Sequence, residues 1–140
     1  MLKQEIIDWL DKMNIKNYSL RDDLVDVEGS VNLYGRKLKV IPVQFGIVKG
    51  DFDCSYNNLK SLEGSPKTVG GNFNCWGNNL ESLDGCPKTV WGYFDCSNNN
   101  LESLKYLPEI KGELHCDDNL KDSEEYCKWK YHFIMNQRNA

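Results

Sequence analysis

The sequence lacks several features that would place the protein in a common functional class. It contains no run of 18 apolar residues, so no membrane-spanning helix is expected. Acidic side chains interrupt the apolar stretch at the N-terminus and no small-residue cleavage site follows, so we expect no signal peptide. Positive charge is not in excess either: the formal net charge is −4, which disfavours binding to nucleic acids or anionic membranes. We therefore expect a cytoplasmic protein that binds neither directly.

Patterns that support catalysis or cofactor binding are also missing. The six cysteines show no paired metal-binding spacing, and in a cytoplasmic chain we interpret them as reduced thiols. The glycines recur at a fixed period and do not form a phosphate-binding loop. Cys86 and Cys127 have no nearby pair of histidine and acid that would activate a nucleophile. We expect no catalytic residue, no metal ion and no cofactor, and interpret the protein as non-enzymatic.

The dominant feature of the sequence is an internal repeat. Residues 71–90 match the segments that lie 21 positions before and 21 positions after them. Each copy reads Gly-x-Phe-x-Cys, followed by an asparagine, two leucines and a proline. A degenerate copy precedes these three, from Gly29 to Val48, and a half copy ends at Leu120. A fixed period near 20 residues is typical of solenoids, so we expect about 4.5 repeats of 20–21 residues over residues 29–120.

The alternation within each copy predicts which side chains point inward. In the copy that begins at Gly71, Phe73 and Cys75 alternate with polar residues, which is typical of a short strand. The inward thiols of successive copies are spread along the stack axis, so we interpret them as packing groups and not as metal ligands. The asparagine that follows three positions after each cysteine is expected to turn into the core and bond backbone groups. These asparagines are Asn57, Asn78, Asn99 and Asn119.

The repeat resembles the leucine-rich repeat. The L-x-L-x-x-N-x-L-x-x-L signature of that family corresponds here to Phe73-x-Cys75-x-x-Asn78-x-Leu80-x-x-Leu83. The narrower pattern G-x-F-x-C-x-x-N-x-L-x-S-L-x-G-x-P-x-x-V resembles small solitary repeat proteins of bacteriophage and bacterial genomes. The resemblance covers about residues 29–120 and implies a short parallel sheet on the concave side and a protein-binding role. It implies no catalytic residues.

The segments on either side of the repeats are expected to cap the stack. Residues 2–13 place Leu2, Ile6, Trp9, Leu10 and Met13 on one helical stripe. Residues 17–27 have the pattern of a hairpin, so residues 1–28 form the expected N-terminal cap. Residues 121–140 are expected to form a C-terminal cap helix with an aromatic stripe and a frayed end at 136–140. Because the ends of a solenoid must be covered, we interpret both helices as caps of a single domain, residues 1–140, and not as partner-binding helices.

The outward positions of successive strands form the candidate site on the expected concave face. They are polar or aromatic, with five acids and no lysine or arginine, although the chain has 17 basic residues. The candidate protein-binding residues are Tyr34, Asp51, Asp53, Asn72, Asn74, Trp76, Tyr93, Asp95, Glu113, His115 and Asp117. One interpretation is an ordinary solvated sheet surface. The other is a set of aromatic anchors inside an acidic rim, which suits a protein partner with a basic surface.

Three hypotheses about function follow from this reading. The leading one is a monomeric protein-interaction module, and the resemblance to phage-borne repeats suggests an accessory protein that binds and modulates a host protein. The second is an acidic nucleic-acid mimic that blocks the basic groove of another protein. The third is a structural or assembly protein that acts through its sheet edges or caps.

Overall fold

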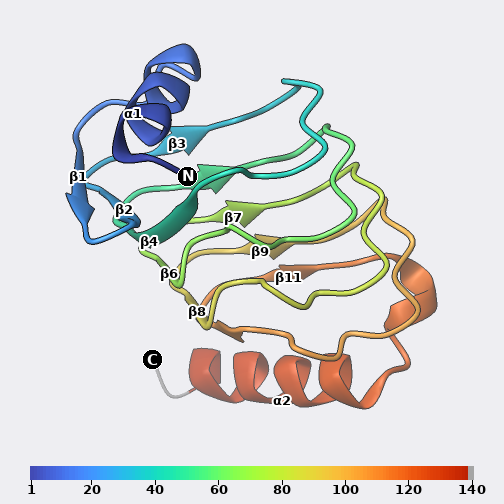
Figure 1. The fold of residues 1–140 in the computed structure, drawn as a ribbon. Coiled ribbons are helices and arrows are strands. Elements are labelled where there is room, and N and C mark those ends of the chain that lie inside the picture. Colours follow the sequence, from blue (N-terminus) through green and yellow to red (C-terminus); the bar gives the residue numbers. More distant parts are fainter. Residues whose placement is uncertain (139–140) are drawn as a thin grey trace.

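Each copy of the repeat forms one turn of a solenoid and contributes one short strand to each of two sheets (Figure 1). The computed structural model describes residues 1–138. Phe52 pairs with Phe73, and Phe73 pairs with Phe94, so the sequence period and the register of the sheet are the same. Equivalent side chains therefore form columns that run along the stack. The predicted repeat solenoid with helical caps is confirmed.

The first sheet is parallel throughout and carries the candidate site. Its five strands lie in the order β11-β9-β7-β5-β3. Their bounds are β3 Val31–Asn32, β5 Phe52–Asp53, β7 Phe73–Asn74, β9 Phe94–Asp95 and β11 Leu114–His115. We call the outer surface of this sheet, together with the residues that flank its strands, the β3–β11 face.

The second sheet is formed by the N-terminal hairpin and the returning half of each full turn, and the repeat pattern does not predict it. Its six strands lie in the order β1-β2-β4-β6-β8-β10 and are parallel except for the antiparallel pair β1 and β2. The bounds are β1 Tyr18–Arg21, β2 Leu24–Val27, β4 Gln44–Val48, β6 Thr68–Val69, β8 Thr89–Val90 and β10 Glu109–Ile110. Two-residue strands show no alternation in sequence. Their pairing depends on the neighbouring turns, which supply the hydrogen-bond partners.

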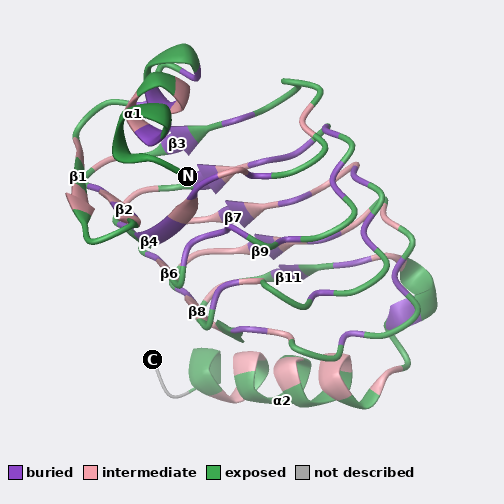
Figure 2. Ribbon diagram, viewed as in Figure 1, coloured by how far each residue is buried: buried purple, intermediate pink, exposed green. Residues whose placement is uncertain are grey.

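The core lies between the two sheets and is built from stacked copies of the same residue. The rings of Phe52 and Phe73 stack with centroids 5.6 Å apart, and those of Phe73 and Phe94 with centroids 5.3 Å apart. Figure 2 shows buried residues in every turn of the stack. The cysteine column, Cys54, Cys75, Cys96 and Cys116, is buried beside these rings. Burial raises the pKa of all four thiols, to about 11 for Cys116, so they remain protonated.

An asparagine ladder joins the turns. The Asn78 side chain donates to the carbonyl oxygens of Cys54 at 3.0 Å and Cys75 at 3.1 Å, and accepts from the Leu59 amide. Asn57 and Asn99 make equivalent bonds. The inward placement predicted for Asn119 is wrong. That residue is exposed in a short 3-10 helix, η1 Asp118–Leu120, because the last half copy places Leu120 one position earlier.

The two ends of the stack are covered by unequal caps. Helix α1, Lys3–Lys12, buries Ile6 and Leu10, whereas Leu2 precedes the helix and is exposed, which corrects its predicted place on the buried stripe. Helix α2, Glu124–Arg138, lies across the far end (Figure 1) and contains no fully buried residue. It continues through 136–138, where fraying was predicted, and the remainder of that segment lies outside the described residues.

Candidate functional site

The structure places the candidate residues in three columns that run along the β3–β11 face. The central column follows the strand register, in which Asp53 pairs with Asn74, Asn74 with Asp95, and Asp95 with His115. A second column precedes the strands and contains Asp51, Asn72, Tyr93 and Glu113. A third follows them and contains Tyr34, Trp76 and Asp117. All eleven candidate side chains are exposed or half-buried.

The column that precedes the strands binds the turns together. The Asp51 carboxylate accepts a hydrogen bond from the Asn72 amide at 2.8 Å, and the Asn72 side chain accepts from the Tyr93 amide at 2.9 Å. A Cβ at Gly71 would collide with the Asp51 carboxylate, so this glycine makes room for the side chain of the previous turn. These two candidate residues therefore have a structural role, which local sequence could not show.

The central column is also hydrogen bonded to its own backbone. Asp53 and Asp95 each accept from the amide and hydroxyl of the serine two positions later, and Asn74 accepts from the Trp76 amide at 2.9 Å. Each residue uses its Oδ1 atom for these bonds. The Oδ2 atom of each aspartate takes no part in these bonds, and the carboxylates contribute to the acidic character of the face. The central column thus fixes the backbone that leads into the third column.

The third column carries a stack of aromatic rings. Tyr34 and Tyr56 stack with centroids 5.9 Å apart and planes 19° apart. Tyr56 and Trp76 stack in turn at 5.8 Å and 13°. Tyr34 is 54% exposed and Tyr56 is 57% exposed, while Trp76 is half-buried. We call Tyr34, Tyr56 and Trp76 the aromatic ladder.

The repeat register does not predict the place of Tyr56 in this ladder. Tyr34 and Trp76 lie 42 residues apart, in register, and the residue midway between them is Ser55. Ser55 is buried, and its hydroxyl is turned toward Asp53. Tyr56 lies at the next position, where φ is 58°. The signal available in the sequence was that Gly35 and Gly77 occupy the equivalent positions, which indicates a left-handed backbone there.

The last turns of the face form a smaller polar cluster. His115 lies edge-on to Tyr93, with ring centroids 5.7 Å apart, and its Nε2 atom is 3.1 Å from the Glu113 carboxylate. Partial burial raises the pKa of Tyr93, and the nearby carboxylates Asp95, Asp53 and Asp51 add to the effect. Tyr93 therefore remains a neutral phenol.

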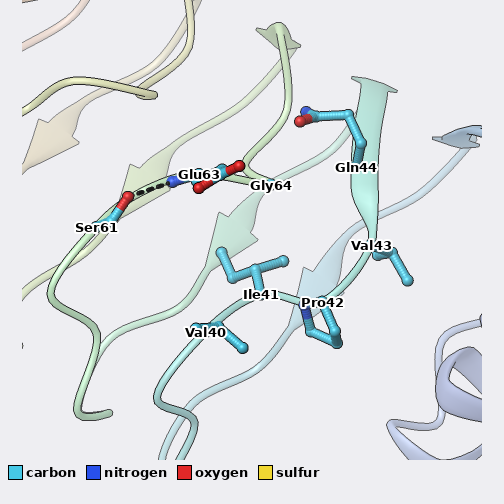
Figure 3. A pocket seen from close by; sticks show the side chains of 8 residues that line it. All are labelled: Val40, Ile41, Pro42, Val43, Gln44, Ser61, Glu63 and Gly64. Atoms are coloured by element: carbon cyan, nitrogen blue, oxygen red, sulfur yellow. Dashed lines mark hydrogen bonds between the residues drawn. The ribbon is translucent and has the colours of Figure 1, made fainter. Parts of the chain in front are cut away.

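Trp91 and a surface hollow lie outside the β3–β11 face. Trp91 is 57% exposed next to the second sheet, with Lys111 Nζ 5.3 Å from its ring centroid. A hollow of about 310 Å³ lies where two successive turns meet, lined by residues 40–44, Ser61, Glu63 and Gly64 (Figure 3). The Gln44 side-chain amide there donates to the carbonyl oxygens of Phe45 and Ser65.

Residues 1–138 contain no group of three or more His, Cys, Asp or Glu side chains placed to hold a metal ion. Neither of the helices in that range is long and apolar enough to cross a membrane. Comparisons with protein-family models, curated proteins and solved structures find no match to this chain. The functional assignment therefore depends on the geometry of the β3–β11 face.

Proposed function

We propose that the protein is a non-enzymatic protein-interaction module that binds a partner with a basic surface through the β3–β11 face. The observation that carries the proposal is the aromatic ladder, an exposed stack of three rings that spans three turns. Exposed tyrosine and tryptophan side chains are favoured binding hot spots, because they bury a large area with little loss of rotamer freedom. The backbone amides of Tyr34 and Trp76 are held in place by hydrogen bonds to the side chains of Asn32 and Asn74.

Charge supports the choice of a basic partner. The face carries Asp51, Asp53, Asp95, Glu113 and Asp117, and no lysine or arginine lies in its three columns. Complementary charge accelerates association and discriminates against acidic proteins. The resemblance of the repeat to phage-borne solitary repeats extends the proposal to an accessory protein that binds and modulates a host protein.

Affinity capture with matched variants tests the proposal. The ladder variant replaces Tyr34, Tyr56 and Trp76 with alanine, and the control variant replaces Trp91 and Tyr106, which are 57% and 53% exposed outside the face. The wild type and the control should retain at least one protein from the native cell extract. The ladder variant should retain at least about tenfold less of it, since hot-spot truncations each cost more than about 1 kcal/mol. Equal capture by the ladder variant would contradict the proposal.

Salt dependence separates this proposal from the nucleic-acid mimic. Surface charge interactions are strongly screened at about 1 M salt, where the Debye length is only about 3 Å. Capture through the aromatic ladder should persist there in reduced form, because burial of the rings is not screened. Complete loss across several basic proteins would instead support the mimic hypothesis.

A further inference from the structure

The aromatic ladder ends at Trp76 because the following turn supplies no ring. The residues there are Ser97, whose hydroxyl donates to Asp95, and the exposed Asn98. Asn98 has a φ of 56°, close to the 58° of Tyr56, and holds the equivalent position two turns later. One face of the Trp76 ring stacks on Tyr56, and no aromatic ring within residues 1–138 stacks on the other.

Two carboxylates lie at the level of this missing ring. Asp95 follows Asn74 in the central column and uses Oδ1 for its bonds to Ser97, so that Oδ2 has no hydrogen-bond partner within residues 1–138. Asp117 belongs to the next turn, but its carboxylate reaches back to the Asn98 amide at 2.8 Å and the Asn99 amide at 3.4 Å. The end of the ladder is thus acidic as well as aromatic.

These features match the chemistry of a guanidinium group. Successive turns are about 4.8 Å apart. A planar group stacked on Trp76 therefore lies level with the turn that contains Asp95 and Asn98, which the Asp117 carboxylate also reaches. A guanidinium stacks flat on an indole ring and directs its in-plane N–H groups toward carboxylate oxygens. An ammonium is a compact, strongly hydrated charge that cannot stack in this way.

We propose that the end of the aromatic ladder at Trp76 binds an arginine side chain of the partner, with Asp95 and Asp117 accepting hydrogen bonds from its guanidinium. This proposal rests on the proposed function and names the group that the β3–β11 face recognises. The basic surface of the partner therefore presents an exposed arginine to this site, and a lysine there would bind less well.

The test uses the full chain and two small probes, N-acetyl-arginine amide and N-acetyl-lysine amide. Each is titrated into the ¹⁵N-labelled protein while the indole N–H resonance of Trp76 is followed, after assignment with Trp76→Phe. The arginine probe should give a saturable shift and bind at least about fivefold more tightly than the lysine probe. Equal shifts from the two probes would overturn the proposal.

Two variants test the geometry. Asn98→Tyr should add a fourth ring at the position equivalent to Tyr56 and remove the response to arginine, whereas Asn100→Tyr, at another exposed asparagine of the same turn, should not. Asp117→Asn should weaken arginine binding at least about threefold. Asp84→Asn makes the same change in net charge at an exposed site outside the face and should have no effect. The dispersion of each spectrum verifies folding.

The outcomes distinguish the two proposals. If the ladder variant loses its captured protein but Asn98→Tyr still binds both that protein and the arginine probe, the arginine site is wrong and the interaction face stands. If the ladder variant keeps its captured protein and arginine amide shows no saturable shift, both are wrong. If Asn98→Tyr loses binding to the captured protein and to the arginine probe, the result supports both proposals.

Discussion

Several polar residues of the stack bond backbone groups of a neighbouring turn. Asn78 shows this most completely, because its single side chain joins three backbone groups in two turns. Asp51 and Asn72 do the same on the surface. Buried backbone groups need hydrogen-bond partners. Side chains such as Asn78 provide them where the two-residue strands leave backbone groups unpaired.

Replacement of Asn78 with alanine should lower the free energy of unfolding by at least about 2 kcal/mol. The change leaves buried backbone groups without their partners, each of which costs about 1–3 kcal/mol. Asn79→Ala is the matched control, because Asn79 is the next residue and is exposed. Urea denaturation followed by circular dichroism measures both. Similar midpoints for the two variants would contradict the role assigned to Asn78.

The hairpin of β1 and β2 begins the second sheet and is tied to it by one carboxylate. Asp26 accepts from Arg21 Nε at 2.9 Å within the hairpin and from the Ile47 amide of β4 at 2.8 Å. The hydrogen bond from Arg21 holds the pKa of Asp26 below its ordinary value, although partial burial opposes the shift. The folded state therefore favours the ionised carboxylate.

Asp26→Asn should lower the urea midpoint at neutral pH and have little effect in acid. A carboxyl whose pKa is lowered by folding stabilises the folded state above its unfolded value of 3.8, and that stabilisation disappears as pH falls through the lower folded value. The urea midpoints of the wild type and variant should thus converge once the pH falls below the lowered pKa of Asp26 in the folded state. Asp23→Asn, in the exposed turn of the same hairpin, is the control. A midpoint difference that does not change with pH would contradict this role.

At the scale of the whole molecule, the two caps protect the stack to different degrees. Helix α1 contributes two fully buried side chains, while α2 is held by half-buried aromatic rings and one indole bond, from Trp129 Nε1 to the Gly112 carbonyl at 3.3 Å. Repeat proteins are stabilised through contacts between neighbouring units. We therefore expect local unfolding to begin at the end of the stack that α2 covers.

Trp129→Ala should accelerate amide hydrogen exchange in α2, β10 and β11 by about tenfold or more while β5 and β7 remain protected, because loss of the indole opens only the last turn. Tyr131→Ala is the control on the same helix, because Tyr131 is 62% exposed. Uniform acceleration across all turns would show instead that the stack opens as one unit.

The sequence by itself determines the columns of the stack. Copies that recur every 21 residues fix the register, and the alternation around Phe73 and Cys75 fixes which side chains enter the core. The inward asparagines and both helical caps follow from the same reasoning, because a stack of similar turns must satisfy its buried amides and cover its ends. The surface columns, with their acids, Tyr34 and Trp76, could also be predicted. The relationship to leucine-rich repeats remains a prediction.

Only the tertiary structure decides what those surface residues do. The second sheet exists because adjacent turns pair, which no local pattern in residues such as Thr68 and Val69 reveals. Tyr56 joins the aromatic ladder because a left-handed backbone at one position directs its ring between those of Tyr34 and Trp76. The sequence predicts that Asp51 belongs to a binding rim. In the structure its carboxylate also accepts a hydrogen bond from the Asn72 amide of the next turn. These outcomes depend on contacts between residues about one turn apart, so they are set by how the turns stack and not by the residues of any one turn.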